Sequence, residues 1–403
     1  MGKMTSLTMT SMRSHVKLLA VVAALTVHTA ALAPQVEARD PAAPFAGRLL
    51  MESRSGTVLF ESEAHRAWPP ASMVKLMGML LVMEAVAGGQ VSLEDPVTTS
   101  ARASRTGGSQ VYLRQGEVFP LGELLKALII ASANDAAVAI AEHIAGTAEA
   151  FVELMNERAR QLGLKDTIYR SVHGLPPASD QEDDLSSAYD LAVLARKAME
   201  HAEIMKWASQ PEESFRDGTF KMTNTNHLIR WYRGATGLKT GYHGRSGFGV
   251  TATATRGNLT LIAVVLGAGT KAGCFDEAAR ILTEGFSTYR LVEAAEKGRP
   301  VGATIPVEGG DVPEVSAIAG EELRLLLKRA EAPDPRVEAR VPRLLVAPVR
   351  KGQPVGEVAV VNGSQVLGTT GLVVDRDVMA VGWLGWWRNW QGPQEESAPE
   401  GSP

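Results

Sequence analysis

The stretch Pro70-Ala71-Ser72-Met73-Val74-Lys75, followed by the apolar run 76–83, decides how the chain is interpreted. A proline suits a helix entry, because a missing N–H costs little there. If Ser72 opens a helix, its side chain and that of Lys75 lie on one face, a turn apart. An amine whose pKa is lowered by burial can take the proton of a serine hydroxyl. Ser72 is therefore a candidate nucleophile, and Lys75 is its candidate general base.

Ser-x-x-Lys alone is a weak signal, because an N-capping serine followed by an exposed lysine has the same spacing. Two further motifs follow it in order, Ser132-Ala133-Asn134 and Lys239-Thr240-Gly241. The set Ser-x-x-Lys, Ser-x-Asn and Lys-Thr-Gly resembles the one found in class A β-lactamases and penicillin-binding proteins. Together the three motifs favour an acyl-transfer enzyme.

Composition excludes several other classes of function. The 403 residues are enough for two domains, and the formal net charge of −4 indicates no polyanion-binding surface, so we expect no nucleic-acid partner. The sequence has no zinc-type Cys/His spacing and no phosphate-binding glycine loop, so we expect no metal and no cofactor. Cys274 is the single cysteine, which leaves no internal disulfide.

The N-terminus predicts export. Lys3, Arg13 and Lys17 precede a mostly apolar run at 18–32, and Val36-Glu37-Ala38 fits the small-x-Ala cleavage pattern. We therefore expect residues 1–38 to be a secretory signal peptide, with an uncleaved N-terminal anchor as the alternative.

Residues 39–295 predict an α+β domain, an antiparallel sheet covered by helices. Strands are expected at 48–52, 57–61, 248–255 and 259–266 and around Lys239, and Arg256-Gly257-Asn258 is a hairpin signal. Residues 90–120 read as a loop region. Further helices are expected at 121–145, 151–162, 187–201 and 275–291. The order of the strands cannot be predicted from these patterns.

Beyond residue 295 the pattern changes. Short Val-rich runs separated by Gly, Pro and Asn predict a small all-β domain at 300–376, with 321–330 as a helix-like or polar-strand exception. Residues 391–403 are polar and are expected to lack structure.

A tryptophan-rich segment lies near the C-terminus. Trp383, Trp386, Trp387 and Trp390 follow the i, i+3, i+4, i+7 pattern of one helical face, which Met379 extends. Such a face in residues 377–390 is typical of an interfacial membrane anchor, and the segment is too short to span a bilayer. The alternative is that these side chains dock on the β domain.

The chain resembles the serine D-alanyl-D-alanine carboxypeptidases, the low-molecular-mass penicillin-binding proteins, from about Gly47 to Leu291. Besides the three motifs, the resemblance rests on Phe151-Val152-Glu153-Leu154-Met155-Asn156, His173-Gly174-Leu175, Asn224-Thr225-Asn226-His227-Leu228 and Val265-Leu266-Gly267-Ala268. It implies a β-lactamase/transpeptidase-like fold, a β-rich second domain and a C-terminal amphipathic anchor. It also implies a location in the cell envelope, at the outer face of the cytoplasmic membrane.

The resemblance assigns the chemistry. Ser72 would attack the carbonyl between the last two D-alanines of a peptidoglycan stem pentapeptide, with Lys75 as its base. Ser132 would pass a proton to the leaving amine. Backbone N–H groups of Ser72 and Tyr242 would form the oxyanion hole. β-Lactams would acylate Ser72.

The resemblance also assigns substrate binding. Asn134 would hold the backbone amide of the substrate, and Thr240, followed by Gly241, would bind its terminal carboxylate. Lys239 would keep the site positive and lower the pKa of Lys75. His173 lies in a loop near the site and is interpreted as structural.

One position departs from the family pattern. Family members commonly carry an arginine, associated with the substrate carboxylate, where this sequence has Cys274. Its absence predicts a lower catalytic efficiency, unless Arg245 or Arg280 replaces it.

Two other functions stay open. A class A β-lactamase needs a deacylating glutamate in a Glu-x-x-Leu-Asn loop, and Glu153-Leu154-Met155-Asn156 is one residue too short. A non-hydrolytic envelope protein that binds peptidoglycan stems is the second alternative, supported only by Cys274.

Overall fold

The computed structural model describes residues 44–177 and 182–382. The predicted signal peptide at 1–38, the four tail tryptophans and the polar tail at 391–403 lie outside the described residues.

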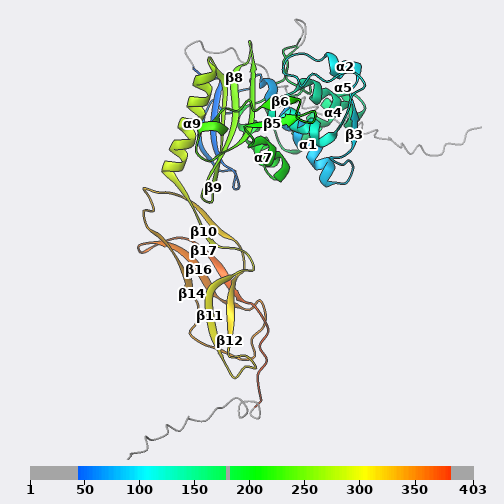
Figure 1. Ribbon diagram of the computed structural model, residues 1–403. Helices are drawn as coiled ribbons and strands as arrows, with labels where there is room; N and C mark the ends of the chain where they lie inside the picture. The colour runs from blue at the N-terminus through cyan, green and yellow to red at the C-terminus, as the bar shows by residue number, and fades with distance from the viewer. Residues whose placement is uncertain (1–43, 178–181, 383–403) are drawn as a thin grey trace, which may run out of the picture. The chain divides into compact units, whose positions relative to one another are not determined.

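A five-stranded antiparallel sheet of order β2-β1-β9-β8-β7 forms the centre of the N-terminal part (Figure 1). Its strands are β1 (Gly47–Glu52), β2 (Val58–Ser62), β7 (Ala235–His243), β8 (Gly247–Arg256) and β9 (Leu259–Ala268). The predicted neighbours β7, β8 and β9 are confirmed. The N-terminal hairpin joins them by pairing β1 with the free edge of β9.

Both faces of this sheet are buried, which explains the nearly continuous apolar run of β9. Successive side chains of a strand point to opposite faces. Ile262 and Val264 therefore pack into a large helical core, whereas Leu261 and Ala263 pack beneath α9 (Lys271–Thr288). The predicted α+β architecture, a sheet covered by helices, is confirmed.

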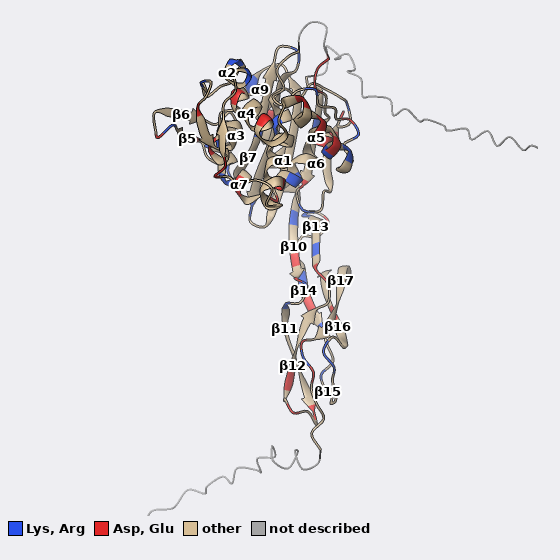
Figure 2. Ribbon diagram, turned by 90° about the vertical axis from the view of Figure 1, so that its right-hand side faces the viewer, with Lys and Arg blue, Asp and Glu red and all other residues tan. Residues whose placement is uncertain are grey.

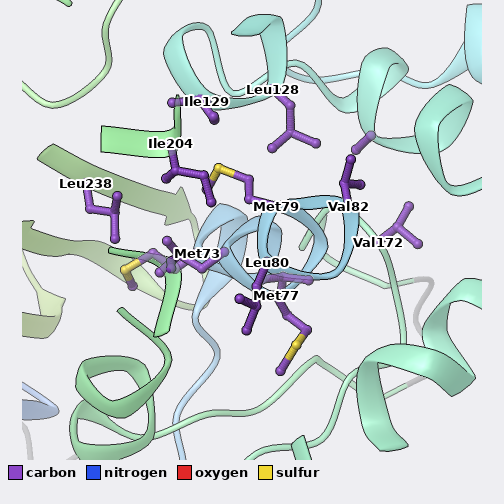
Figure 3. Packing of buried hydrophobic residues seen from close by; sticks show 14 of the residues in the cluster. Met73, Met77, Met79, Leu80, Val82, Leu128, Ile129, Val172, Ile204 and Leu238 are labelled. Carbon is purple, nitrogen blue, oxygen red and sulfur yellow. The ribbon is translucent and has the colours of Figure 1, made fainter. Parts of the chain in front are cut away.

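The central helix α1 (Lys75–Ala87) follows a 3₁₀ turn, η1 (Ala71–Val74). It is apolar on nearly all sides, as expected of a helix enclosed by a core. Figure 3 shows its side chains pointing in several directions, with Leu128, Ile129 and Ile204 among the residues around it.

The other elements of this part are β3 (Pro96–Thr98), α2 (Ala101–Arg105), β4 (Val118–Pro120), α3 (Leu121–Ile130), α4 (Asn134–Ala145), α5 (Ala148–Gln161), α6 (Ala188–Ala198), α7 (Ala202–Ala208), β5 (Glu212–Phe215), β6 (Phe220–Thr223) and α8 (Leu228–Trp231).

Two expectations were wrong in this part. The single helix predicted over 121–145 is two helices, because Ser132 has a left-handed backbone with φ of 59° and interrupts the hydrogen-bond ladder between α3 and α4. The region 90–120 is not a plain loop, since β3, α2 and β4 lie within it.

The C-terminal part is all β. Strand β10 (Tyr289–Ala295) pairs with β13 (Leu323–Lys328), so the ambiguous segment 321–330 contains a strand. Figure 2 shows basic residues on both strands and an acidic residue on β10, and Glu293 of β10 pairs with Arg324 of β13. A six-stranded sheet of order β14-β16-β17-β12-β11-β15 follows. Its strands are β11 (Pro300–Glu308), β12 (Glu314–Ala319), β14 (Pro335–Arg340), β15 (Leu345–Val346), β16 (Pro354–Asn362) and β17 (Gln365–Val374).

Met379 does not extend a helical face, which corrects the prediction for the start of the anchor. Val378 forms a β-bridge with Val349, and Ala380 forms one with Gly310. The residues on either side of Met379 therefore form β-bridges, which a helix over this segment would not allow. Within the described part of the chain, no helix combines the length and apolarity needed to cross a bilayer.

Candidate active site

The structure brings the first motif together as its spacing predicts. Ser72 lies in η1 and Lys75 is the first residue of α1, with the lysine Nζ 3.0 Å from the serine Oγ. Lys75 is fully buried, and Ser72 is half-buried at the surface of a pocket. An amine at this distance is within reach of the hydroxyl proton.

Two glycines allow the backbone to approach this turn closely. A Cβ at Gly174 would lie 2.0 Å from the Ala71 carbonyl oxygen, and one at Gly241 would lie 2.3 Å from that of Pro70. Real Cβ atoms cannot come so near, so both positions require glycine. Gly241 thus has a packing role that the motif did not reveal.

The carbonyl oxygen of His173 holds the other side of Lys75, accepting from Nζ at 2.7 Å. Asp184 fixes this loop by accepting from the Ser171 hydroxyl, which in turn accepts from the Gly174 N–H. The His173 ring accepts from the Leu175 N–H, and burial lowers its pKa to about 4. The ring is therefore neutral at pH 7 and bound within its own loop.

The second and third motifs meet at Ser132. Lys239, on β7, donates from Nζ to the Ser132 hydroxyl at 2.8 Å, and both side chains are buried. The left-handed backbone that breaks the helix at Ser132 places this hydroxyl against the strand. A non-glycine residue in that conformation carries strain, which is commonly found at functional positions.

Burial makes both lysines weak bases. It lowers the pKa of Lys75 well below its ordinary value, and the nearby charge of Lys239 lowers it further. Burial also lowers the pKa of Lys239, to about 7. Desolvation disfavours an ammonium, so the neutral form of Lys75 is populated at a lower pH than that of an exposed lysine.

Asn134 is the first residue of α4, and the two polar atoms of its side-chain amide differ in their hydrogen bonding. Its Nδ2 donates to the Gly107 carbonyl at 2.7 Å, which fixes the orientation of the amide. Its Oδ1 is buried and accepts no hydrogen bond within the described structure. A buried acceptor of this kind is suited to an N–H group of a ligand.

Ser72 and Ser132 line a pocket of about 250 Å³, whereas Lys75, Asn134 and Lys239 are not among its lining residues. It is lined by Ser72, Ser109, Ser132, Thr225, Thr240, Gly241, Tyr242, Phe248, Gly249, Lys271, Cys274 and Phe275. Thr240 donates from Oγ1 to Thr225 Oγ1 at 2.7 Å. Among these lining residues there is no carboxylate, and Lys271 is the single charged side chain.

Ser72 and Tyr242 both line the pocket, and the backbone of Gly241, which precedes Tyr242, lies close to that of Ser72. The ideal Cβ of Gly241, next to Tyr242, would lie 3.3 Å from the Ser72 nitrogen. The Tyr242 side chain is 57% exposed and stacks on Phe248 with ring centroids 4.1 Å apart. The aromatic pair forms an apolar wall beside the nucleophile.

Neither arginine that was expected to replace the missing family arginine lines the pocket. Arg245 pairs with Asp183 at 2.6 Å, and Arg280 pairs with Glu277 and Glu284, each at 2.8 Å. Cys274 itself lies in the pocket wall with 2% of its surface exposed, and burial raises the pKa of its thiol to about 12. The thiol is therefore a neutral packing group.

Sequence reasoning missed Thr225, Ser109 and Lys271. Thr225 lies in the segment 224–228 that carried the family resemblance, but no role was assigned to it. Ser109 follows two glycines, and its carbonyl oxygen accepts from the Asn134 N–H at 2.7 Å. Pocket formation by such residues depends on tertiary contacts that no local pattern records.

The glutamate considered for a β-lactamase is not part of the pocket wall. Glu153 lies exposed on α5 and is not among the lining residues. Asn156 of the same segment binds the backbone of Tyr169 at both its amide nitrogen and its amide oxygen, each at 2.8 Å. That segment therefore serves packing.

Comparisons with known proteins agree with this geometry. A family model described as D-alanyl-D-alanine carboxypeptidase (Peptidase S11) matches residues 33–270, and one for the penicillin-binding protein 5 C-terminal domain matches 289–380. The D-alanyl-D-alanine carboxypeptidase DacF of Bacillus subtilis is 36% identical over 340 residues, which cover 83% of this chain and 86% of the relative.

Solved structures give the same result. Penicillin-binding protein 6B of Escherichia coli has a TM-score of 0.65 at 29% identity and covers 85% of this chain and 98% of its own. Penicillin-binding protein D2 of Listeria monocytogenes, in its ampicillin-bound form, has a TM-score of 0.54 at 29% identity, with 61% of this chain and 98% of its own covered.

Proposed function

The chain belongs to the D-alanyl-D-alanine carboxypeptidase family of serine peptidases, and from this premise we propose that it removes the terminal D-alanine of peptidoglycan stem pentapeptides through an acyl-enzyme on Ser72. The observation that carries the residue assignment is the contact of 3.0 Å between Lys75 Nζ and Ser72 Oγ in a buried setting.

Acylation begins at this contact. Neutral Lys75 takes the proton of Ser72 as Oγ attacks the carbonyl between the two D-alanines. The carbonyl of His173 keeps the amine in place. Negative charge develops on the carbonyl oxygen, toward which the backbone N–H groups of Ser72 and Tyr242 would donate.

Departure of D-alanine needs a proton on its nitrogen. Ser132 lines the pocket and is bound to Lys239, so its hydroxyl is placed to relay that proton. The open Oδ1 of Asn134 would accept from an N–H of the substrate backbone and align the scissile bond. Such alignment raises the rate by holding the reacting atoms in contact.

Water then hydrolyses the acyl-enzyme. The absence of a carboxylate among the described pocket-lining residues argues against β-lactamase chemistry, which uses a glutamate to activate water. β-Lactams should therefore acylate Ser72 and form an acyl-enzyme that water hydrolyses slowly, so they should act as inhibitors.

The test is D-alanine release from a synthetic stem pentapeptide. We expect multiple turnovers by the wild type and none by Ser72→Ala. With penicillin, one adduct should map to the peptide that contains Ser72, and nitrocefin should give a stoichiometric burst. Fast, sustained nitrocefin turnover would favour a β-lactamase, and binding without D-alanine release would favour a non-hydrolytic protein.

We also propose export to the cell envelope and peripheral attachment to the membrane through the tryptophan-rich segment. The support is the i, i+3, i+4, i+7 spacing of the tryptophans, which lie directly after the described end of the C-terminal part.

A further inference from the structure

We propose that Lys271 binds the carboxylate of the substrate's terminal D-alanine. It would thereby take the role of the family arginine whose position is occupied by Cys274 in this chain. The inference rests on the proposed function, because the carboxylate belongs to the D-alanine that the enzyme removes.

The first argument is the charge of the pocket. A carboxylate that leaves water needs a cation or several donors to compensate. Of the side chains that line the pocket in the described structure, Lys271 alone is charged, and the hydroxyls of Thr225 and Thr240 lie in the same wall. Together they offer a cation and neutral donors to one anionic group.

The second argument is where this lysine stands in its helix. Lys271 is the first residue of α9, directly after the capping residue Thr270, and the first turn contains no acidic side chain. A helix N-terminus favours negative charge, so a lysine there weakens the helix. Positions where the residue type opposes the local helix preference are often functional, because the lost stability needs another reason to be kept.

The third argument is that the Lys271 ammonium has no acidic partner and is positioned by the ring of His227. Across residues 44–177 and 182–382, no acidic side chain pairs with Lys271, whereas five of the ten other lysines have such a partner. Its Nζ lies 3.2 Å from Nε2 of His227, whose ring stacks on Phe275 of the pocket wall with centroids 5.5 Å apart. Burial and the charge of Lys271 lower the pKa of His227, so the neutral ring can accept from the ammonium.

The rival cations are engaged elsewhere. Arg245 and Arg280 each bind carboxylates outside the pocket. Lys239 is buried against Ser132 and carries only part of a charge near pH 7. Lys271 also stands three residues before Cys274, so both project from one face of α9.

A pair of thioester substrates tests the proposal. Both are N-acyl-D-alanyl thioesters, with a thioglycolate leaving group that bears a carboxylate in one and the matching neutral thioglycolamide in the other. Lys271→Gln should lower kcat/KM for the carboxylate thioester by roughly tenfold to a hundredfold, the loss expected for a hydrogen bond to a charged group. For the neutral thioester the change should stay below about threefold, and Lys271→Arg should keep most of the activity on both.

Arg230→Gln is the matched control, because Arg230 also lies near His227 but binds exposed Glu212 and is absent from the pocket wall. It should not change the ratio of the two rates. An equal loss on both thioesters in Lys271→Gln, or no loss on the carboxylate thioester, would overturn the proposal. Failure of the proposed function itself would look different, since the wild type would then hydrolyse neither thioester.

Discussion

The ammonium nitrogen of Lys239 lies 2.8 Å from the hydroxyl oxygen of Ser132, and neither side chain is exposed by more than 3%. This contact joins β7 to the break between two helices. It also buries the Lys239 amine, and burial disfavours the ammonium form. The contact therefore affects the free energy of unfolding as well as catalysis.

We predict that Lys239→Met stabilises the fold while it abolishes acylation. Burial lowers the pKa of Lys239 to about 7 in the folded state, from 10.5 when it is exposed. The unfolded chain therefore binds the proton more tightly, and each pKa unit of difference costs the folded state about 1.4 kcal/mol. This cost is fully present below pH 7 and disappears as the pH rises toward 10.5.

Denaturant titrations of both proteins across this pH range measure the effect. The variant should gain about 1–3 kcal/mol in free energy of unfolding at pH 7, because the lost hydrogen bond to Ser132 offsets part of the relief. The advantage should shrink at pH 10. A variant that is less stable at every pH would show that Lys239 is well solvated or well paired in the folded state.

A second prediction concerns the pH dependence of acylation. Burial and the charge of Lys239 both lower the pKa of Lys75, and only its neutral form accepts a proton. The rate of penicillin acylation should therefore rise with pH through one titration that ends below the ordinary lysine value of about 10.4. Stopped-flow measurement of acylation gives this profile, and a rate that is flat from pH 5 to pH 10 would contradict a lysine base.

Replacing Gly241 tests the close packing of the nucleophile turn. The added methyl group in Gly241→Ala would lie 2.3 Å from the Pro70 carbonyl oxygen, so the strand or the turn must move. A shift of about 1 Å at the nucleophile lowers the rate by roughly a hundredfold. Gly244→Ala is the control, because no atom lies within 4 Å of its ideal Cβ. Equal activity of the two variants would disprove the packing role.

An arginine at position 274 should replace the proposed function of Lys271. Cys274 lies in the pocket wall, one helical turn after Lys271. We expect Cys274→Arg to change the wild-type kcat/KM little, but to restore at least tenfold to Lys271→Gln on a diacyl-D-Ala-D-Ala substrate. A large gain in the wild-type background would show instead that the carboxylate site is incomplete without an arginine.

The membrane prediction requires a shorter truncation than the sequence suggested. Val378 is fully buried in the core of the C-terminal part, so a chain that ends before Asp377 would lose core packing. Ending the chain after Gly382 removes the tryptophans and keeps Val378. This variant should retain full activity and lose binding to liposomes, which flotation measures. Liposome binding that persists would show that another surface is responsible.

Several features followed from the sequence because they are set locally or by motif spacing. The hairpin at 256–258 and the strands on either side of it were predictable from the turn residues and from short β-rich apolar runs. Ser72 and Lys75 meet because three residues separate them on one helical face.

What the sequence did not reveal depends on tertiary structure. The apolar spacing of 121–145 continues through the break at Ser132, because α3 and α4 bury faces in the same core. Arg245 and Arg280 fit the carboxylate role by their charge alone, and only the fold shows that Asp183 and Glu277 engage them. Lys271 has no motif, and its place in the pocket follows from how α9 packs on the sheet.

The open acceptor of Asn134 makes the protein responsive to ligands in a measurable way. Its Oδ1 is buried and accepts no hydrogen bond from a protein group among the described residues, and a hydrogen bond is worth about 0.5–1.5 kcal/mol. A ligand N–H that donates to this oxygen gains that stabilisation, whereas an ester of the same size has no N–H to donate. Peptides and β-lactam amides should therefore raise the melting temperature more than esters of the same size, so thermal-shift screening can rank amide-bearing inhibitors without any turnover.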